Sequence, residues 1–201
     1  MSRLKSPFFW FILAVLTTAG LTAIGPAGNS LGANVRVITL HAAWLLTAEI
    51  TLGLAALSGL LGILTRRLAL QRWSAALGRS GIFFWVTALP LALWALQTSW
   101  NSLFLSEPRF RASVVLAATG ILLQIGVTLL ARPTFTSAIN VVFFVALQIS
   151  LKRASSGLSP AASPSLGSGG LSLELFYVGL LFLTLSAAYF MMRWWLSRSI
   201  Q

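Results

Sequence analysis

Residues 37–65 read VITLHAAWLLTAEITLGLAALSGLLGILT, and the ionisable side chains in this stretch are His41 and Glu49. A helix crosses the hydrocarbon core of a bilayer with about 20 apolar residues, so the stretch predicts a transmembrane helix. The whole chain has the same character, because 57% of its 201 residues are hydrophobic, 8% are charged and the mean hydropathy is +0.88. Soluble domains carry about 25% charged residues. The composition therefore excludes a soluble globular protein.

Five further apolar segments emerge when the chain is cut at its charged residues and at its Gly, Pro and Ser clusters. Together with residues 37–65, the predicted spans are 7–25, 80–98, 112–131, 134–151 and 172–195. The predicted fold is an all-α polytopic membrane protein, a bundle of six transmembrane helices forming one domain over residues 1–201. Residues 154–170 are rich in Ser, Gly, Ala and Pro and carry no charge, which predicts a flexible outer loop.

The charges indicate how the bundle is oriented. The chain has 14 Lys and Arg against 3 Asp and Glu, a net charge of +11, and the basic residues lie at the edges of apolar runs. This placement favours contact with anionic lipid headgroups, with no nucleic-acid partner. With the N-terminus inside, nine basic residues fall on the cytoplasmic side and five on the other. We therefore expect a bacterial-type inner (cytoplasmic) membrane, both termini in the cytoplasm, and the Arg66–Arg79 loop as the main anchor.

Some features of the predicted spans are best explained by helix packing. In the second span, Ala55 and Gly59 are small residues four positions apart, as are Ser58 and Gly62, and such pairs let another helix approach closely. Pro90 removes a backbone hydrogen bond from the third span and is expected to kink it. The predicted spans also contain three amide side chains, those of Gln124, Asn140 and Gln148. Their simplest hydrogen-bond partners are one another or facing backbone carbonyls.

Few side chains are left that can carry chemistry. The chain has no Cys and one His, which excludes disulfides, iron–sulfur clusters and any multi-histidine metal cage built by this chain alone. No pairing of a nucleophile with a base is visible, so we do not expect an enzyme. The alternatives for His41 are a hydrogen-bonded structural residue and a metal or haem ligand. Glu49 is costly inside a span, and it is either protonated, hydrogen-bonded or paired with a partner subunit's cation.

Two short motifs resemble a family of haem-handling proteins. His41 stands at the outer mouth of the second span, five residues after Arg36 and downstream of Gly28-Asn29. The loop after the third span begins with Trp100 and closes on Glu107-Pro108-Arg109. With six spans and both ends inside, this pattern is similar to the six-span C subunit of the cytochrome c maturation system. The family's Val-Pro after the histidine is replaced by Ala42-Ala43.

The resemblance implies a set of haem-binding residues on the outer face. His41 would be the iron ligand of haem b, Trp100 and Phe104 would supply aromatic walls in a partly replaced tryptophan signature, and the cations that pair with the haem propionates would be Arg36, Arg109 and Arg111. The family's second axial histidine has no counterpart in residues 143–153. A cytochrome c or its assembly factors would be the partners.

A second hypothesis remains open beside haem handling. In this second hypothesis the chain is a degenerate relative of the family that serves as a structural subunit of a larger respiratory or photosynthetic membrane complex. Its partners would be other integral membrane subunits. The replaced tryptophan signature favours this alternative, whereas the Arg36-to-His41 spacing favours haem handling. A transporter is disfavoured, because no inverted repeat is visible and only the span with Pro90 is plainly interrupted.

Overall fold

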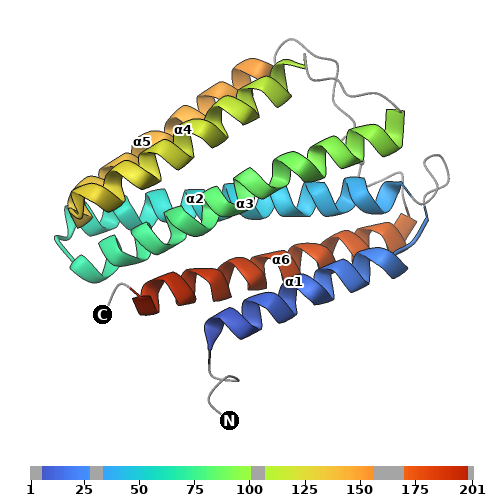
Figure 1. The fold of residues 1–201 in the computed structure, drawn as a ribbon, viewed down its shortest axis with the longest axis horizontal. Coiled ribbons are helices and arrows are strands. Elements are labelled where there is room, and N and C mark those ends of the chain that lie inside the picture. The colour runs from blue at the N-terminus through green and yellow to red at the C-terminus, as the bar shows by residue number, and fades with distance from the viewer. Residues whose placement is uncertain (1–5, 28–33, 101–106, 156–169, 199–201) are drawn as a thin grey trace.

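The computed structural model describes residues 6–27, 34–100, 107–155 and 170–198. All secondary structure in these ranges is helical, which confirms the all-α prediction (Figure 1). The helices are α1 (Pro7–Ile24), α2 (Val35–Leu64), α3 (Leu68–Trp100), α4 (Pro108–Leu130), α5 (Pro133–Ser155) and α6 (Gly170–Arg198). Each of the six is long and apolar enough to cross a membrane. The residues of the predicted flexible loop from 156 to 169 lie outside the described ranges.

The third helix differs from its predicted bounds. It begins at Leu68 and not near residue 80, so the predicted basic loop is reduced to a short turn around Arg66, which has a left-handed φ of 54°. Backbone hydrogen bonding does not depend on side-chain polarity, so arginines and polar residues can continue a helix that a cut at charges would end. Gln71 and Ser74, in the added segment, are buried against neighbouring helices.

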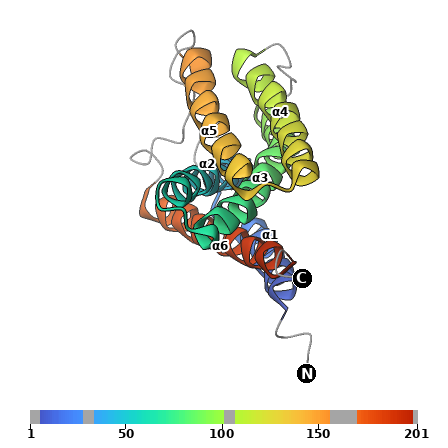
Figure 2. The same cartoon turned by 90° about the vertical axis from the view of Figure 1, so that its left-hand side faces the viewer.

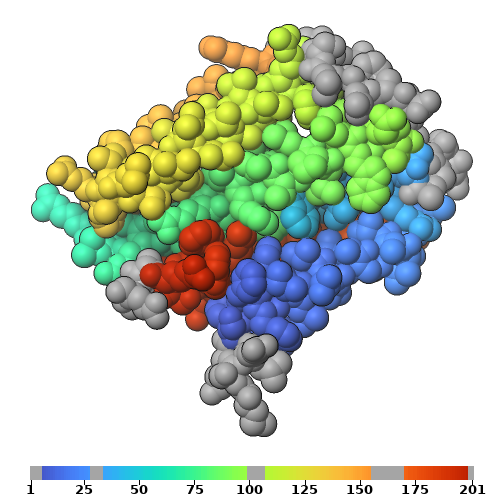
Figure 3. All heavy atoms as spheres, viewed as in Figure 1, coloured from blue at the N-terminus to red at the C-terminus, as the bar shows by residue number. Residues whose placement is uncertain are grey.

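The helices pack as three pairs. The α2–α3 hairpin forms the centre, α1 and α6 lie along one side of it, and α4 and α5 lie along the other (Figures 1 and 2). The space-filling view shows α4 and the α1–α6 pair at opposite edges of the molecule (Figure 3). Contacts of α2 with α3, α5 and α6 make it the central helix of the bundle. Its length and its small side chains suit that position.

The connections define two ends of the bundle. We call the end with the α2–α3 and α4–α5 turns, where α1 begins and α6 ends, the arginine end, after Arg66, Arg67 and Arg132. We call the opposite end, where α2 begins one turn and a half before His41, the histidine end. The antiparallel pairing of α1 with α6 is seen in the Phe8 and Trp194 rings, whose centroids lie 5.3 Å apart.

Hydrogen bonds between helices confirm what was predicted for two of the three amide side chains, namely that they bond to one another or to facing carbonyls. Asn140 of α5 donates to the backbone oxygen of Ser74 at 2.9 Å and accepts a hydrogen bond from the Gln124 amide of α4 at 3.2 Å. Ser74 in turn donates to the backbone oxygen of Ala55 at 2.8 Å. Four helices are thereby linked through one chain of hydrogen bonds, which confirms the predicted role of Gln124 and Asn140.

The small residues on α2 allow other helices of the bundle to approach it closely. A Cβ on Gly59 would lie 2.8 Å from Ser74 Oγ and 3.0 Å from the backbone oxygen of Ser137, and a Cβ on Gly62 would lie 2.9 Å from Gln71. The predicted close helix approach is therefore confirmed, and its partners are α3 and α5. Ser58 does not share this role, because its hydroxyl bonds to the Leu54 and Ala55 carbonyls of its own helix.

Candidate functional site

His41 lies at the histidine end of α2, on the side of the helix that meets α3. Asn34 Nδ2 donates to the backbone oxygen of Thr98, and Trp44 Nε1 donates to Thr87 Oγ1 at 2.8 Å. These two bonds fix the antiparallel register of α2 against α3. His41 falls between them along α2, so it lies level with the stretch of α3 that contains Pro90.

The imidazole of His41 is half-buried, and it makes no hydrogen bond to any residue that the structure describes. Structural histidines in helix interfaces ordinarily donate one ring N–H and accept at the other nitrogen. A metal-ligating histidine likewise donates its other ring N–H to a carboxylate or a carbonyl, and His41 has no such bond to a described residue. The hydrogen bonding of His41 therefore favours neither of the two alternatives left by the sequence.

Arg36 is engaged mainly with α1. Its Nη1 donates to the backbone oxygen of Ala23 at 2.8 Å, in the last turn of α1, where a cation stabilises the negative end of the helix dipole. Its Nε is buried and has no hydrogen-bond partner in the described structure. Because an α-helix has about 3.6 residues per turn, a separation of five residues directs the side chain of Arg36 well away from that of His41. The two side chains are therefore neighbours in sequence that serve different interfaces.

The other predicted site residues are not brought to His41 by helix packing. Arg109 is half-buried and Arg111 is exposed, both in the first turn of α4. Helix α4 packs against α3 and α5, and makes no contact with α2 in the described structure. Figure 1 shows the start of α4 separated from the start of α2 by the end of α3. The side chain of Trp100, and all of Phe104, lie outside the described residues.

The predicted site thus reduces to His41, because Arg36 serves the contact with α1. No group of three or more His, Asp or Glu side chains comes together in the described part of the chain.

A cation inside the bundle was missed by the sequence analysis. Arg79, counted there as part of a cytoplasmic loop, lies within α3 and is half-buried. Its Nη2 donates a long hydrogen bond of 3.4 Å to Thr128 Oγ1 of α4, and its guanidinium carbon lies 5.2 Å from the centroid of the Trp195 ring of α6. It therefore ties α3 to α4 and α6. The seven-residue spacing from Arg72, which places both on one helix face, is the signal that could have revealed it.

Glu49 occupies the middle of α2, half-buried between Ala48 and Ile50. Its carboxyl group makes no hydrogen bond or ion pair with a described residue. Both polar neighbours on α2 are engaged elsewhere, since Thr47 bonds to Thr184 of α6 at 2.7 Å and Thr51 bonds to the Thr47 carbonyl. Tyr177 of α6 lies close enough to interact with Glu49 electrostatically. An acidic group without a hydrogen bond or ion pair is costly at this depth of a membrane, so Glu49 is a second candidate site.

Comparison with known proteins adds no relative from which either site could be interpreted. No protein-family model, no curated protein and no solved structure matches this chain.

Proposed function

We propose that this protein holds haem at the outer face of a bacterial-type inner membrane for cytochrome c assembly, with His41 as the iron ligand. The observation that carries the proposal is the half-buried imidazole at the histidine end of α2, which belongs to the one histidine of the chain. The similarity of the Arg36-to-His41 spacing to the six-span C subunit of the cytochrome c maturation system supports it.

The residues present fit a carrier better than a permanent haem protein. The chain has one His, so His41 supplies one axial position and leaves the other to a ligand from elsewhere, such as a client cytochrome or an assembly factor. A site with one protein ligand and few ion pairs binds haem less firmly than one with two, which suits its release to a client.

The alternative is a structural subunit of a larger respiratory or photosynthetic membrane complex. One observation favours it specifically, namely that the carboxyl group of Glu49 makes no hydrogen bond or ion pair with a described residue. A cation or amide from another integral membrane subunit would satisfy that group. The two proposals use different parts of α2, its first turns and its middle, and are separable by mutation.

An absorption spectrum of the purified protein tests haem handling. We expect a Soret band in the wild type, its loss in His41→Ala, and its recovery when His41→Gly is supplied with free imidazole, because the chain has no other histidine. Leu46→Ala, a half-buried change on the same helix, is the matched control and should keep the band. A wild-type protein without haem, or a His41→Ala spectrum identical to wild type, would contradict the proposal.

The same preparations test the alternative. On a mild-detergent gel, Glu49→Leu should release the protein from its complex, whereas His41→Ala should leave the complex intact. If Glu49→Leu migrates with the same partners as wild type, Glu49 is not what holds the subunit there.

A further inference from the structure

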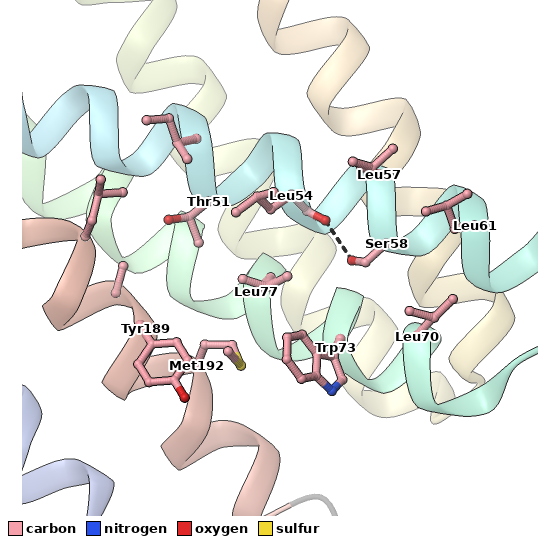
Figure 4. Close-up of a pocket in the computed structure, with 13 residues that line it drawn as sticks. Thr51, Leu54, Leu57, Ser58, Leu61, Leu70, Trp73, Leu77, Tyr189 and Met192 are labelled. Carbon is pink, nitrogen blue, oxygen red and sulfur yellow. Dashed lines mark hydrogen bonds between the residues drawn. The ribbon is translucent and has the colours of Figure 1, made fainter.

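An apolar groove runs along the arginine-end half of the bundle, between α2, α3 and α6. Its volume is about 290 Å³. In Figure 4, Leu54, Leu57 and Leu61 of α2 line one side, Trp73 and neighbouring leucines of α3 line the second, and Tyr189 and Met192 of α6 line the third. Leu57 is 53% exposed and Trp73 is 41% exposed, so the groove is open along its length and not sealed in the core.

A ligand in the groove would contact mainly hydrocarbon, because the two aliphatic hydroxyl groups that line it already donate hydrogen bonds within α2. Ser58 Oγ donates to the Leu54 carbonyl at 2.7 Å, and Thr51 Oγ1 donates to the Thr47 carbonyl at 2.7 Å. The remaining lining residues are apolar, apart from the tip of Tyr189 and the indole N–H of Trp73. The matching ligand is therefore a hydrocarbon chain.

The length of the groove matches that of a lipid acyl chain. From Ile50 to Leu61 the groove follows α2 for about 17 Å at about 1.5 Å per residue, roughly half of a hydrocarbon core that is about 30 Å thick. That length is the length of one acyl chain within a single leaflet, so the groove spans one leaflet.

The charges beside the groove identify the headgroup. Arg66 and Arg67 form the turn at its arginine end, and Arg193 lies one turn beyond Tyr189 on α6. The acidic side chains of the chain are elsewhere, with Glu49 in the middle of α2 and the other two, Glu107 and Glu174, at the histidine end. Cations without acidic neighbours at a membrane surface attract anionic lipids, at about 1 kcal/mol per Lys or Arg.

We propose that the protein holds one anionic phospholipid from the leaflet at the arginine end. One acyl chain lies in the groove between Leu57, Trp73 and Tyr189, and the phosphate lies against the guanidinium groups of Arg66 and Arg67. This proposal does not depend on haem handling, because the groove and His41 are at opposite ends of the bundle.

Native mass spectrometry of the detergent-purified protein tests the proposal. After delipidation, the protein is offered vesicles of phosphatidylglycerol or of phosphatidylcholine, and bound lipid is counted. We expect one retained phosphatidylglycerol per chain and much weaker retention of phosphatidylcholine. Leu57→Trp fills the groove and should lower retention by about tenfold or more. Leu129→Trp, at an 80% exposed position of α4, is the matched control and should retain lipid as wild type.

A double change tests the headgroup contact. Arg66→Gln with Arg67→Gln should lower phosphatidylglycerol retention by about 30-fold, the equivalent of about 1 kcal/mol for each arginine, and should bring it close to that of phosphatidylcholine. Arg132→Gln, an exposed cation on the α4–α5 turn, should leave the preference unchanged. Equal retention of the two lipids by wild type, unchanged retention in Leu57→Trp, or a protein mass bound in place of lipid would overturn the proposal.

Discussion

Replacing Gly59 with Ala should destabilise the bundle even though Ala is the stronger helix former. The added Cβ would meet Ser74 Oγ at 2.8 Å and the backbone oxygen of Ser137 at 3.0 Å. The backbone oxygen cannot rotate away, and moving Ser74 breaks its hydrogen bonds to Ala55 and Asn140. The perturbation therefore disturbs the contact of α2 with both α3 and α5.

The size of the effect follows from two terms. Overpacking a well-filled interface costs about 1–3 kcal/mol, and an interhelical hydrogen bond in a membrane protein contributes on average about 0.6 kcal/mol. The gain in helix propensity from Gly to Ala is about 0.8–1 kcal/mol, and it is shared by a control at Gly126 of α4, where a Cβ meets nothing within 4 Å. Gly59→Ala should thus be less stable than Gly126→Ala by about 2–4 kcal/mol.

Unfolding in mixed micelles, followed by circular dichroism as the fraction of denaturing detergent rises, measures that difference. Gly126→Ala should unfold at the wild-type midpoint or above it, and Gly59→Ala clearly below. If the two variants unfold together, the close approach of α2 to Ser74 and Ser137 is not a determinant of stability, and the reasoning fails.

Three further predictions concern the polar groups and the topology. Asn140→Leu should lower the unfolding midpoint in the same assay, since it removes the partner of Ser74 and Gln124 together; an unchanged midpoint would mean that these bonds add nothing to stability. Trp44→Phe removes the indole donor to Thr87 and should cost about 1 kcal/mol, whereas equal stability would argue against that bond. A cysteine at Ser163, introduced into a chain that has no native Cys, should react with an impermeant thiol reagent added from outside the cell; labelling only from the cytoplasmic side would reverse the proposed orientation.

The number of helices and their approximate positions could be predicted from local composition. Each segment is apolar over the length that a bilayer requires, and the backbone of such a segment has to satisfy its own hydrogen bonds as a helix. The start of α3 was predicted twelve residues late because Arg72 and Arg79 look like a boundary in the sequence, whereas a helix accommodates them when their side chains reach the membrane surface or pack between neighbours.

The candidate site was predicted only in part. His41 could be singled out because it is the one histidine of the chain, and Arg36 because of its spacing from His41. Their spacing of five residues already directs the two side chains to different sides of α2. Which helices lie on those sides was not predictable, since it depends on how α1 and α3 pack around α2. Arg109 and Arg111 were grouped with His41 by motif alone, and the helix that carries them packs on the far side of α3.

The membrane-spanning helices could be predicted from the sequence alone, because hydrophobicity and length are properties of each segment taken separately. The contact of Gly59 with Ser74, the position of Arg79 between α4 and α6, and the groove between α2, α3 and α6 appear only in the folded bundle. These features depend on the order and rotation of the helices around one another. Inside a bilayer that arrangement is set by packing and by a few interhelical hydrogen bonds, which apolar patterning along the chain does not reveal.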